Sequence, residues 1–357
     1  MSPRSTKAAR FAPRANRSGS IAGFTLIELM VAMLLGLIVI GGVTSVFLAN
    51  QQVYRTNAAL SEVQDNTRMS FELLAQNIRE AGLTGCSNNG QVANVLADGP
   101  SNGGTDWWAN WNNALRGYDS STVANPALTV GTASGQQLTG TDSLMLLNAA
   151  DNGSSISGND TTGYTFTLNG SNGDFAAKKI MIVCDPGQAT LFRASSYDTS
   201  GTSPVVGYAL ASGSNTVNCS TGLGYPTVCT AAGTAYAYGA NAMIAPIQAG
   251  VWYVGHNPVG GTSLYLSSID TDTGTATAQE MVRDVTAMNI TYHMVNQPNF
   301  VAASKVTSWG SVDAVQVKLA MQSSNAHVAT SSSSGGSAAA PIQRSYTVTA
   351  TVRNRVK

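Results

Sequence analysis

The sequence is poor in charged and aromatic residues. Of its 357 residues, 11% are charged and 7% are aromatic, whereas charged residues make up about a quarter of a typical globular domain. Histidine occurs three times and cysteine four times, with no CxxC or HExxH spacing among them. Zinc sites and metalloprotease centres that depend on those spacings are therefore not predicted.

Basic residues are scarce outside the N-terminus. Five of the nineteen Lys and Arg residues lie within residues 1–23, where there is no acidic residue, so the remainder carries fourteen basic against nineteen acidic residues. A nucleic-acid-binding surface needs clustered positive charge and is not favoured. Gly, Ser, Thr and Asn supply most of the polar character, which suits a loop-rich β domain.

One long apolar run follows the basic segment. From Phe24 to Ala49 the only formally charged residue is Glu28. As a helix this run would measure about 39 Å, enough to cross a hydrocarbon core of about 30 Å. A secretory signal peptide has a shorter apolar region and an A-x-A-like cleavage site, which Phe47-Leu48-Ala49 does not match. The sequence therefore predicts a membrane-spanning helix with a cytoplasmic N-terminus.

The helical pattern continues beyond the apolar run. Apolar and small residues recur at spacings of three, four and seven, as on one face of an amphipathic helix; they are Val53, Leu60, Val63, Thr67, Phe71, Leu74 and Ile78. Gly82 is a residue type that commonly follows a helix, so we expect one helix over residues 24–81. Its first half needs lipid or other helices around it, and its second half needs a domain to pack against.

The rest of the chain predicts an antiparallel sheet. Runs of alternating or β-branched residues are separated by turn residues; they are Ser143–Asn148, Lys179–Cys184, Ala189–Ala194, Met243–Ile247, Val251–Val254, Leu264–Ile269, Ala287–Met294, Val312–Met321 and Tyr346–Val352. Residues 331–341 are of low complexity and read as a flexible connection. The predicted fold class is α+β, with a long N-terminal helix packed on a C-terminal antiparallel β-sheet domain with long loops.

The cysteines are even in number, which predicts two disulfides in an oxidising compartment. Cys219 and Cys229 are ten residues apart in a loop rich in Gly and Thr, so we expect them to pair locally. Cys86, just after the helix, would then join Cys184 at the end of a strand.

Three further motifs allow two interpretations each. Three tryptophans within residues 107–111 predict either a loop packed onto the core or a sugar-binding platform. Asp270 and Asp272 suggest a tight turn or calcium ligands, although the glycine of this DTDTG stretch falls one position too early for an EF-hand. Residues 99–103 match GxSxG, but no helix is predicted after them. We therefore predict no catalytic residue, metal ligand or cofactor.

The stretch Gly23 to Met30, GFTLIELM, resembles the processing signal of type IV pilins and of type II secretion pseudopilins. In that family a prepilin peptidase cuts after the glycine and methylates the new N-terminal phenylalanine. The resemblance implies a cut between Gly23 and Phe24, and pairing of Glu28 with the N-terminal amine of a neighbouring subunit. Pairing would offset the cost of placing a carboxylate at membrane depth.

The C-terminal third resembles minor pilins of the PilW type. The similarity rests on QEMVRDVTAMNITYHM, on Trp309 before SVDAVQVKLAMQ, and on RSYTVTATVRNR. It implies a type IV pilin-like fold and a structural role, not an enzymatic one, in a protein first inserted in the inner membrane and then carried at or near the tip of an extracellular pilus. A J-type minor pseudopilin of a type II secretion system and a tip adhesin that binds through the loop region are the alternatives.

These interpretations imply a set of partners and a division of the chain. The partners are the prepilin peptidase, other minor pilins, the major pilin and the inner membrane, with a large tip adhesin as a further candidate. The predicted segments are a cleaved leader (1–23), a transmembrane or filament-core helix (24–49), an amphipathic helix (50–82), a loop-rich region (83–142) and an antiparallel sheet domain with insertions (143–357).

Overall fold

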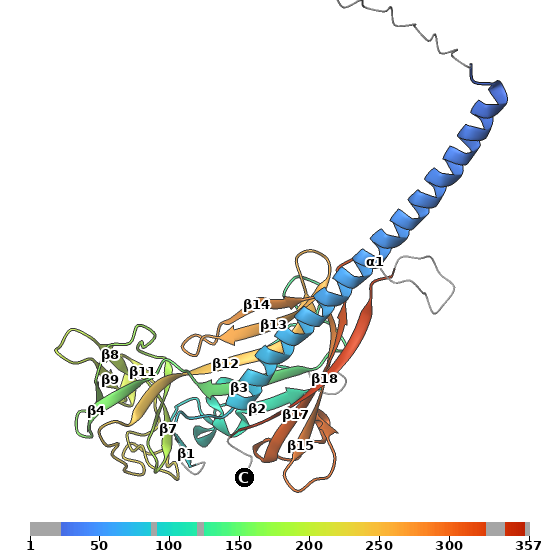
Figure 1. Cartoon of the computed structure of the whole chain (residues 1–357). Helices are drawn as coiled ribbons and strands as arrows, with labels where there is room; N and C mark the ends of the chain where they lie inside the picture. Colours follow the sequence, from blue (N-terminus) through green and yellow to red (C-terminus); the bar gives the residue numbers. More distant parts are fainter. Residues whose placement is uncertain (1–22, 87–90, 120–124, 326–339, 354–357) are drawn as a thin grey trace, which may run out of the picture. The chain divides into compact units, whose positions relative to one another are not determined.

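The computed structural model describes residues 23–86, 91–119, 125–325 and 340–353 (Figure 1). The predicted leader, apart from Gly23, therefore lies outside the described residues. Contacts divide the chain into two units that meet within helix α1 (Leu26–Glu80): one reaches to Arg55 and the other begins at Thr56. The described part of the first unit, residues 23–55, is almost entirely helical, and the second unit contains the rest of α1 and the strands.

The strands of the second unit form two principal sheets and one short hairpin. The larger sheet contains β1 (Val92–Asn94), β2 (Leu115–Tyr118), β3 (Ser143–Ala149), β4 (Ser154–Asp160), β5 (Thr165–Leu168), β6 (Ile180–Cys184), β7 (Ala189–Arg193), β8 (Ser196–Asp198), β9 (Val205–Gly207), β12 (Met243–His256), β13 (Thr262–Ile269) and β14 (Ala276–Arg283). The smaller sheet contains β15 (Val285–Met294), β16 (Val301–Ala302), β17 (Val312–Gln322) and β18 (Gln343–Thr351), and the hairpin is β10 (Ala211–Ser212) with β11 (Asn215–Thr216).

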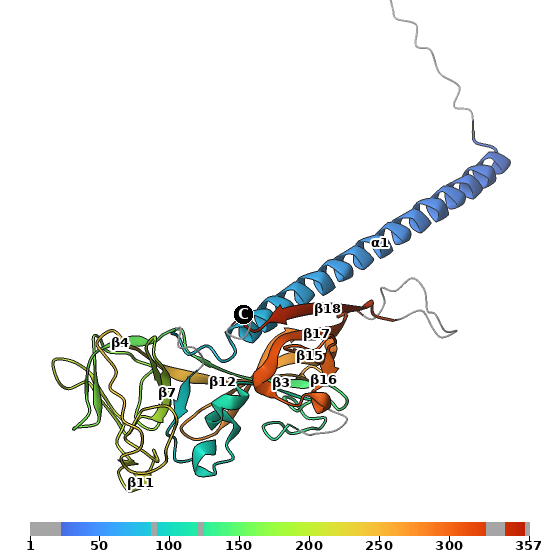
Figure 2. The ribbon, with the colours of Figure 1, turned by 90° about the horizontal axis from the view of Figure 1, so that it is seen from below.

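Strand β12 joins two parts of the larger sheet. Its first residues, Met243 to Pro246, pair with β6, and Met243 and Ile244 also pair with β4. From Ile247 onward it pairs with β3 on one side, and from Gly250 onward with β13 on the other. The pairs are antiparallel apart from β1 with β7. Figures 1 and 2 show β4 and β7 gathered at one end of β12, in an insert lobe that we define as residues 151–242.

The C-terminal part of α1, residues 56–80, packs into the principal core of the second unit. Val63, Leu74 and Ile78 are fully buried there. They lie against apolar side chains from both principal sheets; these include Leu144, Trp252, Leu264, Met288, Val317 and Leu319. The indole Nε1 of Trp252 also donates a hydrogen bond to Asn77 Oδ1 at 3.3 Å. The α+β arrangement predicted from the sequence, a long helix on a mostly antiparallel sheet, is confirmed.

The buried face of α1 differs in detail from the predicted stripe. Val63, Thr67, Leu74 and Ile78 are buried as expected, but Val53 is 58% exposed. Leu60 and Phe71 are only partly buried, while the small residues Ala59 and Ser70 are buried. The predicted stripe was built mainly from large apolar residues and therefore omitted these two small ones. Small residues are buried here because they allow the helix to approach the strands closely.

The end of α1 is connected directly to the larger sheet. The helix ends at Glu80, and Gly82 has a positive φ of 73°, as expected for a residue that follows a helix. The backbone N–H of Gly82 donates to the Leu147 carbonyl at 2.7 Å, and the Ala149 N–H donates to the Leu83 carbonyl at 2.9 Å. The chain leaving the helix therefore runs beside β3.

Most of the predicted strands are present, but several have different bounds in the structure. The two runs predicted at residues 243–247 and 251–254 are one strand, because Gly250, where a break was expected, pairs with Leu146 on one side and Ser268 on the other. Strand β14 was not predicted, since its exposed residues lack the alternation of a half-buried strand. Most of the predicted low-complexity connection, residues 331–339, lies outside the described residues.

Candidate functional site

The N-terminus of α1 is capped by side chains of its own first residues. The Glu28 N–H donates to Thr25 Oγ1 at 3.3 Å, and both the hydroxyl and the backbone N–H of Thr25 donate to Glu28 Oε2, at 3.3 and 3.5 Å. This reciprocal pattern is a capping box, in which a Thr and a Glu three residues later satisfy each other's backbone donors. The T-x-x-E spacing was visible in the sequence, but the role of Thr25 was missed because Glu28 was interpreted as a pairing group for a neighbouring subunit.

The rest of the first unit presents apolar side chains outward. Phe24 is 79% exposed and Leu26 77%, and none of the most apolar stretch of α1 is buried within the protein. By its length and composition α1 can cross a membrane. Two polar side chains within the apolar stretch bond to their own helix, with Thr44 Oγ1 donating to the Ile40 carbonyl at 2.8 Å and Ser45 Oγ to the Gly42 carbonyl at 2.9 Å. Such internal bonds suit an apolar environment, where water is absent.

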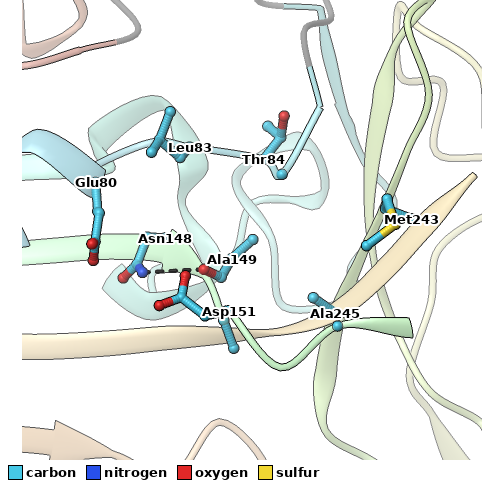
Figure 3. Close-up of a pocket in the computed structure, with 11 residues that line it drawn as sticks. Glu80, Leu83, Thr84, Asn148, Ala149, Asp151, Met243 and Ala245 are labelled. Atoms are coloured by element: carbon cyan, nitrogen blue, oxygen red, sulfur yellow. Dashed lines mark hydrogen bonds between the residues drawn. The ribbon is translucent and has the colours of Figure 1, made fainter. Parts of the chain in front are cut away.

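The second unit has a pocket beside the C-terminal end of α1 (Figure 3). We call it the acidic pocket. Its volume is about 230 Å³, and it is lined by Glu80, Leu83, Thr84, Gly85, Asn148, Ala149, Ala150, Asp151, Gly153, Met243 and Ala245. The Asn148 side-chain amide donates to the Ala149 carbonyl at 3.1 Å. The sequence did not predict this pocket, because its residues come from three segments that meet only in the fold.

The cysteines pair as expected from the sequence. Cys86 is bonded to Cys184 across 98 residues of chain, with Cα atoms 5.8 Å apart. Cys219 is bonded to Cys229 across ten residues, with Cα atoms 5.0 Å apart. The first disulfide attaches the segment that follows α1 to the end of β6, next to the acidic pocket.

The tryptophan loop is packed onto the core. Trp111 is 8% exposed and belongs to a buried cluster, and Trp107 and Trp108 are partly buried against the same cluster. Burial raises the pKa of the neighbouring Asp106, and the nearby Asp98 carboxylate adds to this effect. The loop is thus part of the core, as one of the two interpretations expected, and the rings of Trp107 and Trp108 meet edge to face with their planes 82° apart.

The other two ambiguous motifs are turns. Residues 270–275 connect β13 to β14, with the Gly274 N–H donating to the Asp270 carbonyl at 2.7 Å and a positive φ at Gly274. Within the described residues no group of three or more His, Cys, Asp or Glu side chains could hold a metal ion. Of the GxSxG stretch, Pro100–Asn102 form a single 3-10 turn and Ser101 is exposed, so the strand–turn–helix context of a hydrolase nucleophile is not present there.

A partly buried ion pair attaches the loop before the tryptophans to the β13–β14 turn. Arg193 is 8% exposed and bonds to the Asp98 carboxylate. Its guanidinium also donates to the carbonyls of Thr271, at 2.6 Å, and Lys178, at 2.8 Å. These contacts satisfy the buried cation, so the pair acts structurally. Sequence reasoning missed it, since 95 residues separate Asp98 from Arg193.

Comparison with protein families gives two matches. Residues 20–44 match the prokaryotic N-terminal methylation motif, and residues 251–355 match type IV pilus-assembly protein W. Together these are the marks of a PilW-type pilin with a prepilin motif. No curated protein and no solved structure matched the chain.

The PilW match and the geometry agree on the architecture. The match begins within β12 and continues through β13, β14 and the smaller sheet, which form much of the core around residues 56–80 of α1. The methylation motif covers the capping box and the outward-facing apolar residues. The two matches support a minor pilin related to the type IV pilus, and the matched family is a structural pilus component. The methylation motif followed by a long apolar helix is typical of membrane-anchored pilins.

Proposed function

We propose that this protein is a minor pilin that is processed by a prepilin peptidase and then initiates or tips a type IV pilus. The observation that carries the proposal is the N-terminal half of α1. It starts within the motif GFTLIEL, presents apolar side chains in every direction, and continues into a segment packed in a globular domain. One helix thus has a surface for membrane or filament neighbours and a surface for its own domain.

Processing would occur between Gly23 and Phe24, with methylation of the new amine on Phe24. Gly23 and Phe24 are exposed and precede the helix, so the bond between them lies in accessible, non-helical chain. The basic residues before Gly23 would keep the N-terminus in the cytoplasm while the apolar helix enters the inner membrane. The segment division given above, with a leader of residues 1–23, is part of this proposal.

Replacing Gly23 with valine is expected to block processing, because a branched side chain next to the scissile bond crowds the peptidase site. Mass spectrometry of the membrane-bound protein should find a mature chain beginning with N-methyl-Phe24 in the wild type and an uncut chain in the variant. Gly23→Ala, which adds only one methyl group, is the matched control and should be cut more slowly. An uncut wild-type chain in cells with an active peptidase would contradict the proposed site.

Glu28 would change partners during assembly. In the uncut chain its carboxylate accepts hydrogen bonds from Thr25. In a filament, an N-terminal amine of a neighbouring subunit would supply a full positive charge within an apolar environment, where an unpaired carboxylate is costly. Assembly would therefore exchange a capping contact for an ion pair between subunits.

The size of the globular part supports the proposed tip position. Residues 83–357 form a large domain with an insert lobe, and the residues from 45 to 250 match neither family model. A shaft subunit must fit the same neighbours at each helical step, which a large insert obstructs. At a tip one side of the subunit is open, and the other side can rest on minor and major pilins.

Quantitative mass spectrometry of purified pili should therefore find this subunit in small, constant number per filament, independent of filament length. Sheared short and unsheared long filaments provide the comparison, because a tip subunit becomes scarcer relative to the major pilin as length grows. Copy number that rises in proportion to length would place the subunit in the shaft and reject the tip assignment.

A further inference from the structure

The acidic pocket has the chemistry of a receptor for a basic side chain. We propose that it receives a Lys or Arg side chain from the globular domain of another pilin subunit. This inference rests on the proposed function, because it names a partner for a subunit that assembles with other pilins. It concerns a different part of the chain from the N-terminal motif.

The base of the pocket is apolar and made of small side chains. Ala149 and Ala245 are 8% and 7% exposed, and Leu83 and Met243 add larger apolar surface. Met243 is 40% exposed, which is unusual for a large apolar residue at the start of a buried strand. The aliphatic stem of Lys or Arg buries well on such a surface while its charged end stays at a polar edge.

The edge of the pocket is negative. Glu80 and Asp151 both line it, and Figure 3 shows both carboxylates next to Asn148. Glu80 is also the last residue of α1, and the C-terminal end of a helix carries partial negative charge. As far as the described residues go, no Lys, Arg or His lines the pocket. An anion would be repelled here, whereas a cation would meet two carboxylates.

The walls of the pocket are held in place before any partner binds. The Cys86–Cys184 disulfide anchors the segment after α1. The Gly82 N–H bonds to the Leu147 carbonyl at 2.7 Å, and the Ala150 N–H bonds to the Pro246 carbonyl at 2.9 Å. A preformed receptor loses little conformational entropy on binding, which favours recognition of a single side chain.

The position of the pocket in the chain points to one particular neighbour. Its residues lie at 80–85, 148–153 and 243–245, outside both family matches. Contacts shared by the whole family would be expected within the matched parts. A pocket outside them, with its own charge, suits selection of a specific neighbouring pilin, since charge complementarity sets specificity.

Photocrosslinking in pilus-forming cells tests the proposal with the full chain. Benzoylphenylalanine at position 243 should crosslink to a peptide of another pilin that contains Lys or Arg close to the crosslink. Glu80→Lys with Asp151→Lys should lower this product about fivefold or more, the loss expected when two partly exposed charge pairs become repulsive. The same crosslinker at Val259, an apolar residue that is 70% exposed and outside the pocket, is the matched control and should not respond to the charge reversal.

A reciprocal substitution makes the test specific. Changing the basic residue found in the crosslinked peptide to Glu should restore the product in the Glu80→Lys, Asp151→Lys chain and lower it in the wild type. Glu80→Gln with Asp151→Asn keeps the side-chain shapes, and intact disulfides in each variant show that the domain has folded. No crosslink, a crosslink to lipid or to a second copy of this chain, a peptide without a basic residue, or insensitivity to charge reversal would each overturn the proposal.

Two further measurements in the same cells distinguish failure of the pocket proposal from failure of the proposed function. The mature N-terminus and incorporation into filaments are measured independently of the crosslink. Normal processing and incorporation without the predicted crosslink would reject only the pocket proposal. A chain that is neither cut nor incorporated would reject both.

Discussion

Replacing Glu28 with alanine is expected to remove most filaments while leaving membrane insertion and processing intact. Insertion depends on the apolar length of the helix, and removing a carboxylate from membrane depth relieves a cost of about 2.5 kcal/mol or more. Assembly depends on the charge, because the amine of a neighbouring subunit would otherwise remain unpaired in an apolar environment. Leaving one member of a buried ion pair alone costs about 3–5 kcal/mol, enough to prevent initiation in most attempts.

The structure supplies a control that separates pairing from capping. Glutamine also closes a capping box, so Glu28→Gln keeps the contacts with Thr25 but removes the charge. If pairing is the function, Glu28→Gln should lose filaments nearly as completely as Glu28→Ala. Thr25→Val, which weakens the cap by about 1 kcal/mol, should have a much smaller effect.

Electron microscopy of filament number per cell, together with fractionation and mass spectrometry of the subunit, measures these outcomes. Wild-type filament numbers in Glu28→Gln cells would mean that Glu28 acts through the capping box alone. Failure of Glu28→Ala to enter the membrane would show that the residue has a role in insertion that the apolar length does not explain.

Removing the Cys86–Cys184 disulfide is expected to lower the free energy of unfolding by more than removing Cys219–Cys229. The first closes a loop of 98 residues and the second a loop of ten. In the chain-entropy model, loops of about 100 and about 15 residues correspond to about 4.7 and about 3 kcal/mol. A loss of the larger amount is a large part of the 5–15 kcal/mol that typically stabilises a domain.

Alanine pairs are suitable replacements, because Cys184 is 1% exposed and a serine hydroxyl would be buried beside the strand. Urea unfolding of the detergent-solubilised full chain can be followed by tryptophan fluorescence. The five tryptophans lie between Trp107 and Trp309, so the signal reports on the globular unit. Equal losses for the two alanine pairs at similar denaturant slopes would contradict the loop-length argument.

Local signals in the sequence were enough to predict the N-terminal helix, its processing motif and the cysteine pairing. An unbroken apolar run, a glycine before it and a Glu five residues after that glycine are properties of neighbouring residues, and they predicted the helix and its processing motif. The cysteine pairing was predictable for a related reason, since a spacing of ten residues favours a local bond and leaves one other pair. The T-x-x-E capping box was equally local and could have been found.

The tertiary structure decided what depends on residues that are distant in the chain. Gly250 lies in the middle of one long strand because β3 and β13 pair with it from both sides. Ala59 and Ser70 are buried because this part of the helix packs closely in the second unit. The acidic pocket exists only because the end of α1, the turn after β3 and the start of β12 meet in space. Such contacts follow from packing across long sequence separations, which no window of neighbouring residues contains.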